Sequence, residues 1–169
     1  MRMTWIAVAA TCAALAACTT TSSESPQPGS TAATPSSTGQ ASAAVAGTYC
    51  AKASSTMVGS ALGVSAGQLK AWVEGPVTVC SYVGGAEVVV RYQVGESATS
   101  FAAQRSAMQH QQVTTMSGLA DGAFFARYSA GTTVSDTLAA RQGSIAVFIT
   151  SPAAAGAERT LMTKLLAAL

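Results

Sequence analysis

Charged residues are scarce in this sequence. Asp, Glu, Lys and Arg make up 9% of the 169 residues, against about a quarter in typical soluble domains. The net charge is +2, and neither a basic nor an acidic run occurs. Nucleic-acid binding needs a face rich in Lys and Arg that displaces counterions, so we expect no nucleic-acid partner.

Histidine occurs once, as His110. A metal site needs several converging ligands, and none stands near His110 at helical spacing, so we expect no metal. A serine nucleophile would have to use His110 with Asp121 or Asp136, and the sequence has no G-x-S-x-G elbow. The other carboxylates form no close pair that suggests acid–base chemistry. We therefore predict no catalytic residue and no cofactor, and an enzyme that uses His110 is the least favoured hypothesis.

The sequence also lacks an apolar run of about 20 residues, which is the length that a membrane-spanning helix needs. The apolar stretch over residues 4–17 follows Arg2 and has the length of a signal-peptide core. Its last residues and the one that follows, Leu15-Ala16-Ala17-Cys18, resemble the bacterial lipobox. This pattern predicts a lipoprotein signal peptide over residues 1–17, and a lipid anchor on Cys18 at the extracytoplasmic face of the cell membrane. The alternatives are an ordinary secretory leader cut elsewhere and a cytosolic protein with a buried N-terminal helix.

Large side chains are nearly absent between Cys18 and Ala46. Residues 19–46 contain no aromatic residue and one charge, and they are rich in Ser, Thr and Pro. Such a segment cannot bury enough apolar area to offset its ordering entropy. We therefore predict a disordered tether over residues 18–46, with a root-mean-square span of about 30 Å.

Residues 47–169 carry the patterns of one globular domain. Apolar periodicity and turn residues predict an α+β fold, in which helices cover an antiparallel sheet in the order α-β-β-α-β-β-β-α. The predicted helices cover 52–62, 97–112 and the segment from Ser151-Pro152 to the C-terminus. The predicted strands cover 77–83, 87–94, 123–128, 133–141 and 144–150, and another strand begins at 113–116.

Local signals place the boundaries of these elements. Gly63 is expected to end the first helix in a left-handed conformation, and Ser65 with Gln68 resembles a capping box for one further turn. Gly84-Gly85 predicts a two-residue hairpin, and Gln142-Gly143 predicts another tight turn. Two sets of side chains are expected to face the core: Ala98, Phe101, Ala102 and Met108 in the second helix, and Leu161, Met162, Leu165, Leu166 and Leu169 in the last.

Cysteine is rare, and its four positions divide into two groups. Cys12 lies in the predicted leader and Cys18 at its end, which leaves Cys50 and Cys80 in the mature domain. Outside the cytoplasm, an even pair is most simply a disulfide. A redox or metal role for the pair is disfavoured, because it lacks a C-x-x-C spacing and further ligands.

Two aromatic stretches are candidates for a ligand or partner surface. "SGLADGAFF", residues 117–125, predicts a tight loop that leads into a strand, with Phe124 and Phe125 on opposite faces. It is either a ligand rim or a turn followed by a core strand. Trp72 in "LKAWVEGP" is either an exposed recognition residue or a cover over the sheet edge.

Several stretches together resemble a family of small secreted lipoproteins of actinobacteria, which carry a two-cysteine domain of unknown function. They are "YCAKASSTMVGSALG", "CSYVGGAEVVVRY", "SGLADGAFF", "LAARQGSIAVFI" and the closing amphipathic helix, and they span residues 49–169. Members commonly have a proline before the first cysteine, where this chain has Tyr49. The resemblance implies a lipid-anchored envelope protein and supplies no catalytic residues.

These observations favour a non-enzymatic binding or interaction module of the cell envelope, whose partner is a protein, a glycan or a small ligand. The alternative is a carrier of an apolar ligand or lipid, held in a cavity between the sheet and the helices.

Overall fold

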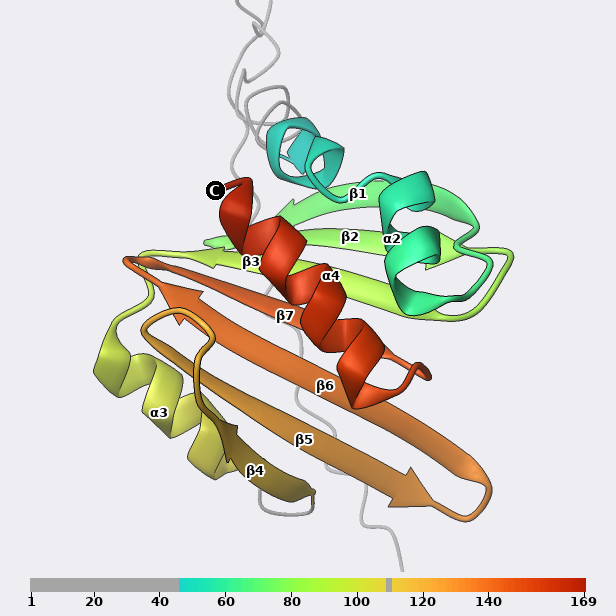
Figure 1. The fold of residues 1–169 in the computed structure, drawn as a ribbon. Helices are drawn as coiled ribbons and strands as arrows, with labels where there is room; N and C mark the ends of the chain where they lie inside the picture. The colour runs from blue at the N-terminus through green and yellow to red at the C-terminus, as the bar shows by residue number, and fades with distance from the viewer. Residues whose placement is uncertain (1–45, 109–110) are drawn as a thin grey trace, which may run out of the picture. The chain divides into compact units, whose positions relative to one another are not determined.

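The computed structural model describes residues 46–108 and 111–169. It contains a seven-stranded sheet with helices packed on both faces (Figure 1). The elements are α2 Ser55–Leu62, β1 Gln68–Glu74, β2 Val77–Val83, β3 Val88–Val94, α3 Ala98–Ala107, β4 Gln112–Met116, β5 Gly122–Ala130, β6 Thr133–Gln142, β7 Ile145–Ser151 and α4 Ala155–Ala167. Residues 46–51 are also helical. The predicted α+β class is confirmed.

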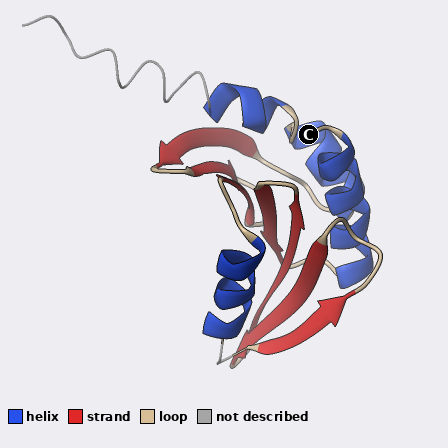
Figure 2. Ribbon diagram, turned by 90° about the vertical axis from the view of Figure 1, so that its left-hand side faces the viewer, coloured by secondary structure: helices blue, strands red, loops and turns tan. Residues whose placement is uncertain are grey.

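Every neighbouring pair of strands is antiparallel, in the order β1-β2-β3-β7-β6-β5-β4. Helix α3 connects β3 in the middle of the sheet to β4 at the far edge. The chain then returns through β5 and β6, and β7 pairs with β3. Figure 2 shows a curved sheet with α3 inside the curve and the other helices on the opposite face.

Each face of the sheet has its own hydrophobic cluster. The larger cluster lies under α2 and α4 and includes Val58, Tyr92, Ile149 and Leu165. The smaller cluster lies under α3 and consists of Phe101, Phe124, Ala126, Ala139, Ala146 and Phe148. Of the apolar residues expected to face inward from α4, all but Leu169 are buried. The strand alternation therefore divides the apolar residues between two layers.

The predicted end of the first helix is confirmed. The Ser54 side chain accepts a hydrogen bond from the Met57 amide and caps the N-terminus of α2. Gly63 ends α2 with φ of 69°, a left-handed conformation that glycine adopts without steric cost. The predicted disulfide between Cys50 and Cys80 is also present.

Several local predictions are wrong. Ser65 and Gln68 do not cap a helical turn, because Gln68 begins β1, a strand that the sequence analysis did not predict. Ser151 does not cap the last helix, because it ends β7 and α4 begins at Ala155. Ala46, assigned to the tether, is helical and buried.

The hairpin between β2 and β3 is longer than the two residues predicted. Residues 84–87 connect the strands, and the Ala86 amide donates to the Ser65 carbonyl at 3.0 Å. A Cβ atom at Gly85 would lie 2.1 Å from the same carbonyl oxygen. Glycine is therefore needed here because residues 65–67 pack directly against the loop.

Candidate functional site

The site begins at the loop "SGLADG", residues 117–122, which joins β4 to β5 and ends in Gly122, the first residue of β5. The Leu119 side chain is buried in the larger hydrophobic cluster and anchors the loop. Ala120 follows with φ of 49°, the only non-glycine residue in the described part of the chain with a positive φ. Backbone strain of this kind persists where the surrounding structure enforces it, and it often occurs at functional sites.

The strained loop fixes the position of Asp121. The Asp121 amide donates to the Arg141 carbonyl at 2.9 Å, and its carboxylate accepts a hydrogen bond from the Gly143 amide at 2.7 Å. Arg141 Nη1 lies 3.6 Å from Asp121 Oδ2 and also donates to the Gly143 carbonyl. These contacts therefore connect the 117–122 loop to the turn between β6 and β7.

A pocket of about 190 Å³ opens between this loop, the sheet and α3. Helix α3 contributes one wall and the strands contribute the other; the lining residues are Ala98, Phe101, Ala102, Arg105, Thr115, residues 121–124 and Arg141. The rings of Phe101 and Phe124 contact each other, with centroids 5.2 Å apart, and form part of the apolar lining. Ala98 and Ala102 were expected to face inward, and both line this pocket while remaining exposed. The space under this part of α3 is therefore left open.

Two arginines and one carboxylate give the pocket its charge. Arg105 Nη1 donates to the Thr115 hydroxyl at 3.0 Å, and this bond ties the exposed α3 residue to β4. The Arg141 side chain is only 16% exposed, whereas that of Asp121 is 51% exposed. The pocket thus combines apolar walls with a net positive charge.

The three aromatic residues singled out from the sequence do not form one site. Phe124 lines the pocket and is fully buried. Phe125 lies on the opposite face of the sheet, as predicted, where the Arg127 guanidinium is 5.7 Å from its ring centroid. Trp72 lies on the edge strand β1, five strands away from β5, or about 24 Å across the sheet.

Trp72 is 40% exposed, and its indole Nε1–H donates to Glu74 Oε1 at 2.7 Å. The register places Trp72 in line with Val79 on β2, Arg91 on β3 and Phe148 on β7. Phe148 belongs to the cluster under α3, so Trp72 lies on the same sheet face as α3. A ligand of the size of the α3 pocket therefore cannot contact both Trp72 and Phe124.

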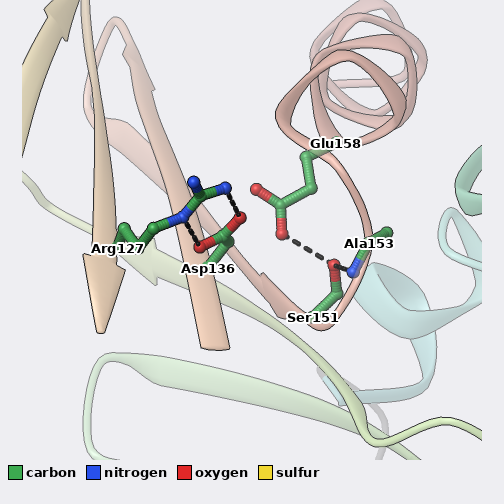
Figure 3. A network of polar contacts seen from close by, with 5 residues as sticks. All are labelled: Arg127, Asp136, Ser151, Ala153 and Glu158. Atoms are coloured by element: carbon green, nitrogen blue, oxygen red, sulfur yellow. Dashed lines mark hydrogen bonds and ion pairs between the residues drawn. The ribbon is translucent and has the colours of Figure 1, made fainter. Parts of the chain in front are cut away.

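A second polar cluster lies on the opposite face, between the sheet and α4 (Figure 3). Arg127 Nε and Nη2 donate to the two carboxylate oxygens of Asp136 at 2.9 and 2.7 Å. The Ser151 hydroxyl donates to Glu158 Oε1 at 2.7 Å and accepts from the Ala153 amide at 3.1 Å. Glu158 is fully buried, and its Oε2 has no hydrogen-bond partner in the described part of the chain.

The surroundings of Glu158 disfavour its charged form. The pKa of Glu158 is raised to about 8, mainly by burial; the negative charge of Asp136 adds to the rise, whereas the Ser151 hydrogen bond and Arg127 oppose it. The Glu158 carboxyl is therefore mostly protonated at neutral pH. In this state it closes the turn between β7 and α4 without placing an unpaired charge under the helix.

Sequence reasoning did not identify Arg105, Arg141 or Glu158. His110 lies outside the described residues, as do Cys18 and residues 1–45. Within residues 46–108 and 111–169, no group of three or more His, Cys, Asp and Glu side chains is placed to hold a metal ion. No helix in the same ranges is long and apolar enough to span a bilayer.

Replacing Ala120 with glycine is expected to stabilise the protein by about 0.5–1 kcal/mol. Glycine adopts a positive φ without the steric cost that Ala120 bears, and this gain exceeds its larger unfolded-state entropy. Urea unfolding would measure the change. The matched control is Ala103→Gly in the middle of α3, which should lose about 1 kcal/mol. A destabilised Ala120→Gly variant would show that the loop depends on the alanine methyl group.

The chain matches no protein-family model and no curated protein, and its structure matches no solved structure.

Proposed function

We propose that this protein is an extracytoplasmic lipoprotein, anchored to the cell membrane through Cys18, whose domain binds a small ligand in the α3 pocket without transforming it. The observation that carries the proposal is the open, partly charged space under α3, where a helix face and a sheet face would ordinarily close on each other. The Leu15–Cys18 pattern supports export and anchoring at the membrane, and the disulfide is consistent with an oxidising compartment.

The volume of the pocket limits the ligand. Sites for drug-sized molecules measure about 300–1,000 Å³, whereas this pocket measures about 190 Å³. The ligand is accordingly a small molecule with a single ring or a short branched body. The alternative of an apolar carrier would be supported by native mass spectrometry that finds a lipid bound to the purified protein.

Ligand-observed NMR on the full chain in lipid nanodiscs tests the binding function. A panel of neutral, cationic and anionic compounds, each with one ring, is screened against the wild type and Ala102→Leu, in which the larger side chain fills the pocket. The control is Ala103→Leu on the same helix, at a position that does not line the pocket. At least one class of compound should bind the wild type and the control and lose most of its signal with Ala102→Leu. Binding by no class would contradict the proposal.

Lipidation of Cys18 is tested by metabolic labelling with an alkyne fatty acid. Wild type should be labelled and should yield a mature N-terminus at Cys18, whereas Cys18→Ser should lose the label down to background. Cys12→Ser is the matched control. Cys12 lies in the predicted leader, so its substitution should leave labelling unchanged. Equal labelling of the Cys18→Ser variant would show that the lipid is attached elsewhere.

A further inference from the structure

We infer that the ligand of the α3 pocket is a small organic carboxylate, whose anionic group contacts Arg105 and Arg141 while its apolar body lies against Ala98, Phe101 and Ala102. This inference rests on the proposed function, because it assigns a chemical class to the ligand of the same pocket.

The two arginines have hydrogen-bonding capacity to spare. Each guanidinium has five N–H donors in a planar fork. Within the described part of the chain, Arg105 uses only Nη1, toward Thr115, and Arg141 uses only Nη1, toward the Gly143 carbonyl. The remaining donors of both residues are therefore available to an anion in the pocket, and a guanidinium fork matches the two oxygens of a carboxylate.

Of the two arginines, Arg141 should contribute more to the binding of the anionic group, because its side chain is largely buried. Among the residues that the structure describes, its only carboxylate partner is Asp121, at 3.6 Å, which is longer than a direct hydrogen bond. The Asp121 oxygen at that distance already accepts the Gly143 amide at 2.7 Å. A largely buried cation with so loose a partner gains more from an added anion than an exposed arginine does, since water screens the exposed charge more strongly.

The total charge of the pocket favours a monoanion. Two guanidinium groups and one carboxylate leave one net positive charge among the lining residues. A single carboxylate neutralises that charge, whereas a phosphate monoester near its second ionisation would bring a further negative charge toward Asp121. We therefore assign the anionic group as a carboxylate.

The apolar part of the pocket sets the size of the rest of the ligand. Ala98, Phe101 and Ala102 on α3 supply its apolar lining, and the Phe101 ring packs on the buried Phe124 ring behind them. An apolar cavity of about 150 Å³ in another protein holds benzene, so about 190 Å³ accommodates one ring with a carboxylate attached. Benzoate is thus a suitable probe, and benzamide is its neutral counterpart of the same shape.

The test measures benzoate and benzamide binding by titration NMR, with the full chain in nanodiscs and empty nanodiscs as a blank. Benzoate should bind with a Kd of about 1 mM or tighter, and benzamide should bind at least tenfold more weakly. Arg141→Gln and Arg105→Gln should each weaken benzoate binding by about three- to tenfold and leave benzamide unchanged. Arg91→Gln is the matched control: Arg91 lies on the same sheet face over the Phe148 ring, outside the pocket lining, so its loss should have no effect.

The outcomes separate this inference from the proposed function. If benzoate and benzamide bind equally and Ala102→Leu removes both, the pocket is a binding site and the carboxylate assignment is wrong. If no compound of the panel binds, the proposed function is wrong as well. Circular dichroism verifies that Arg141→Gln is folded; if it is not, Arg105→Gln decides alone, because Arg105 is exposed on α3.

Discussion

Replacing Cys50 and Cys80 together by alanine is expected to lower the free energy of unfolding by about 3–4 kcal/mol. The disulfide closes a loop between residues 30 positions apart, and the loop-entropy model assigns a cross-link of this length about 3–4 kcal/mol. A domain of this size has a total stability of about 5–15 kcal/mol. The variant would therefore lose a large share of it.

The position of the disulfide explains why other contacts cannot replace it. Cys50 lies in the helical segment 46–51, and Cys80 lies in the middle of β2; both side chains are buried. Nearby, the Tyr82 hydroxyl donates to the Ala53 carbonyl, and the Tyr49 ring packs on Tyr92 with centroids 5.1 Å apart. These contacts form only once the segment before α2 is already on the sheet, so they do not constrain the unfolded chain as the disulfide does.

Urea unfolding of the wild type, the double variant and the reduced wild type would test this prediction. The reduced wild type should lose about as much stability as the double variant, because both lack the same cross-link. The Ala120→Gly variant should respond to reduction as the wild type does, since its change acts through the 117–122 loop. A loss below about 1 kcal/mol in the double variant would contradict the prediction.

The sequence predicted elements whose signals are local. The N-cap of α2 at Ser54 and its end at Gly63 depend on a few neighbouring residues, and so does the turn at Gln142-Gly143. Strand β1 was missed because Ser65 and Gln68 resemble a capping box, and because the edge strand leaves much of its surface exposed. Its pairing with β2 overrides that local pattern, and pairing between strands is not visible in a local window.

The candidate site was less predictable, because its parts meet only through the sheet register. Arg105 and Arg141 stand far apart in the sequence, and the pairing of β4 with β5 and of β5 with β6 brings them to one pocket. Glu158, in contrast, carried a usable signal. It precedes Leu161, Met162 and Leu165 at helical spacing, so the apolar stripe of α4 places a carboxyl on the buried face.

That buried carboxyl leads to the last prediction: the protein should be more stable at pH 5 than at pH 9, by an amount on the order of 3–5 kcal/mol. The pKa of Glu158 rises from 4.5 to about 8 on folding, mainly because of burial. The folded state therefore binds the proton more tightly than the unfolded state. Its stabilisation is complete below pH 4.5 and is lost as the pH rises through about 8. Each pKa unit corresponds to about 1.4 kcal/mol.

The substitution Glu158→Gln should remove this dependence. Glutamine keeps an oxygen that can accept the Ser151 hydrogen bond and carries no charge at any pH. At pH 5, we expect the variant to lie within about 1 kcal/mol of the wild type; at pH 9, it should be more stable by several kcal/mol. Urea unfolding at intervals between pH 5 and pH 9 measures both curves. Glu87→Gln is the matched control, because Glu87 is exposed and its loss should leave the pH dependence of the wild type intact.

The charged groups that face Glu158 determine where the transition falls. Arg127 on β5 favours the ionised form of Glu158, and Asp136 on β6 opposes it, so the two members of this ion pair act in opposite directions on the carboxyl. Arg127→Met removes the charge that favours the ionised form of Glu158 and leaves Asp136, which opposes it. The pKa of Glu158 should then rise, and the loss of stability should move to a higher pH. Parallel stability curves for the wild type and Glu158→Gln between pH 5 and pH 9 would contradict this account. They would mean that water reaches the Glu158 carboxyl and that α4 tolerates the charge.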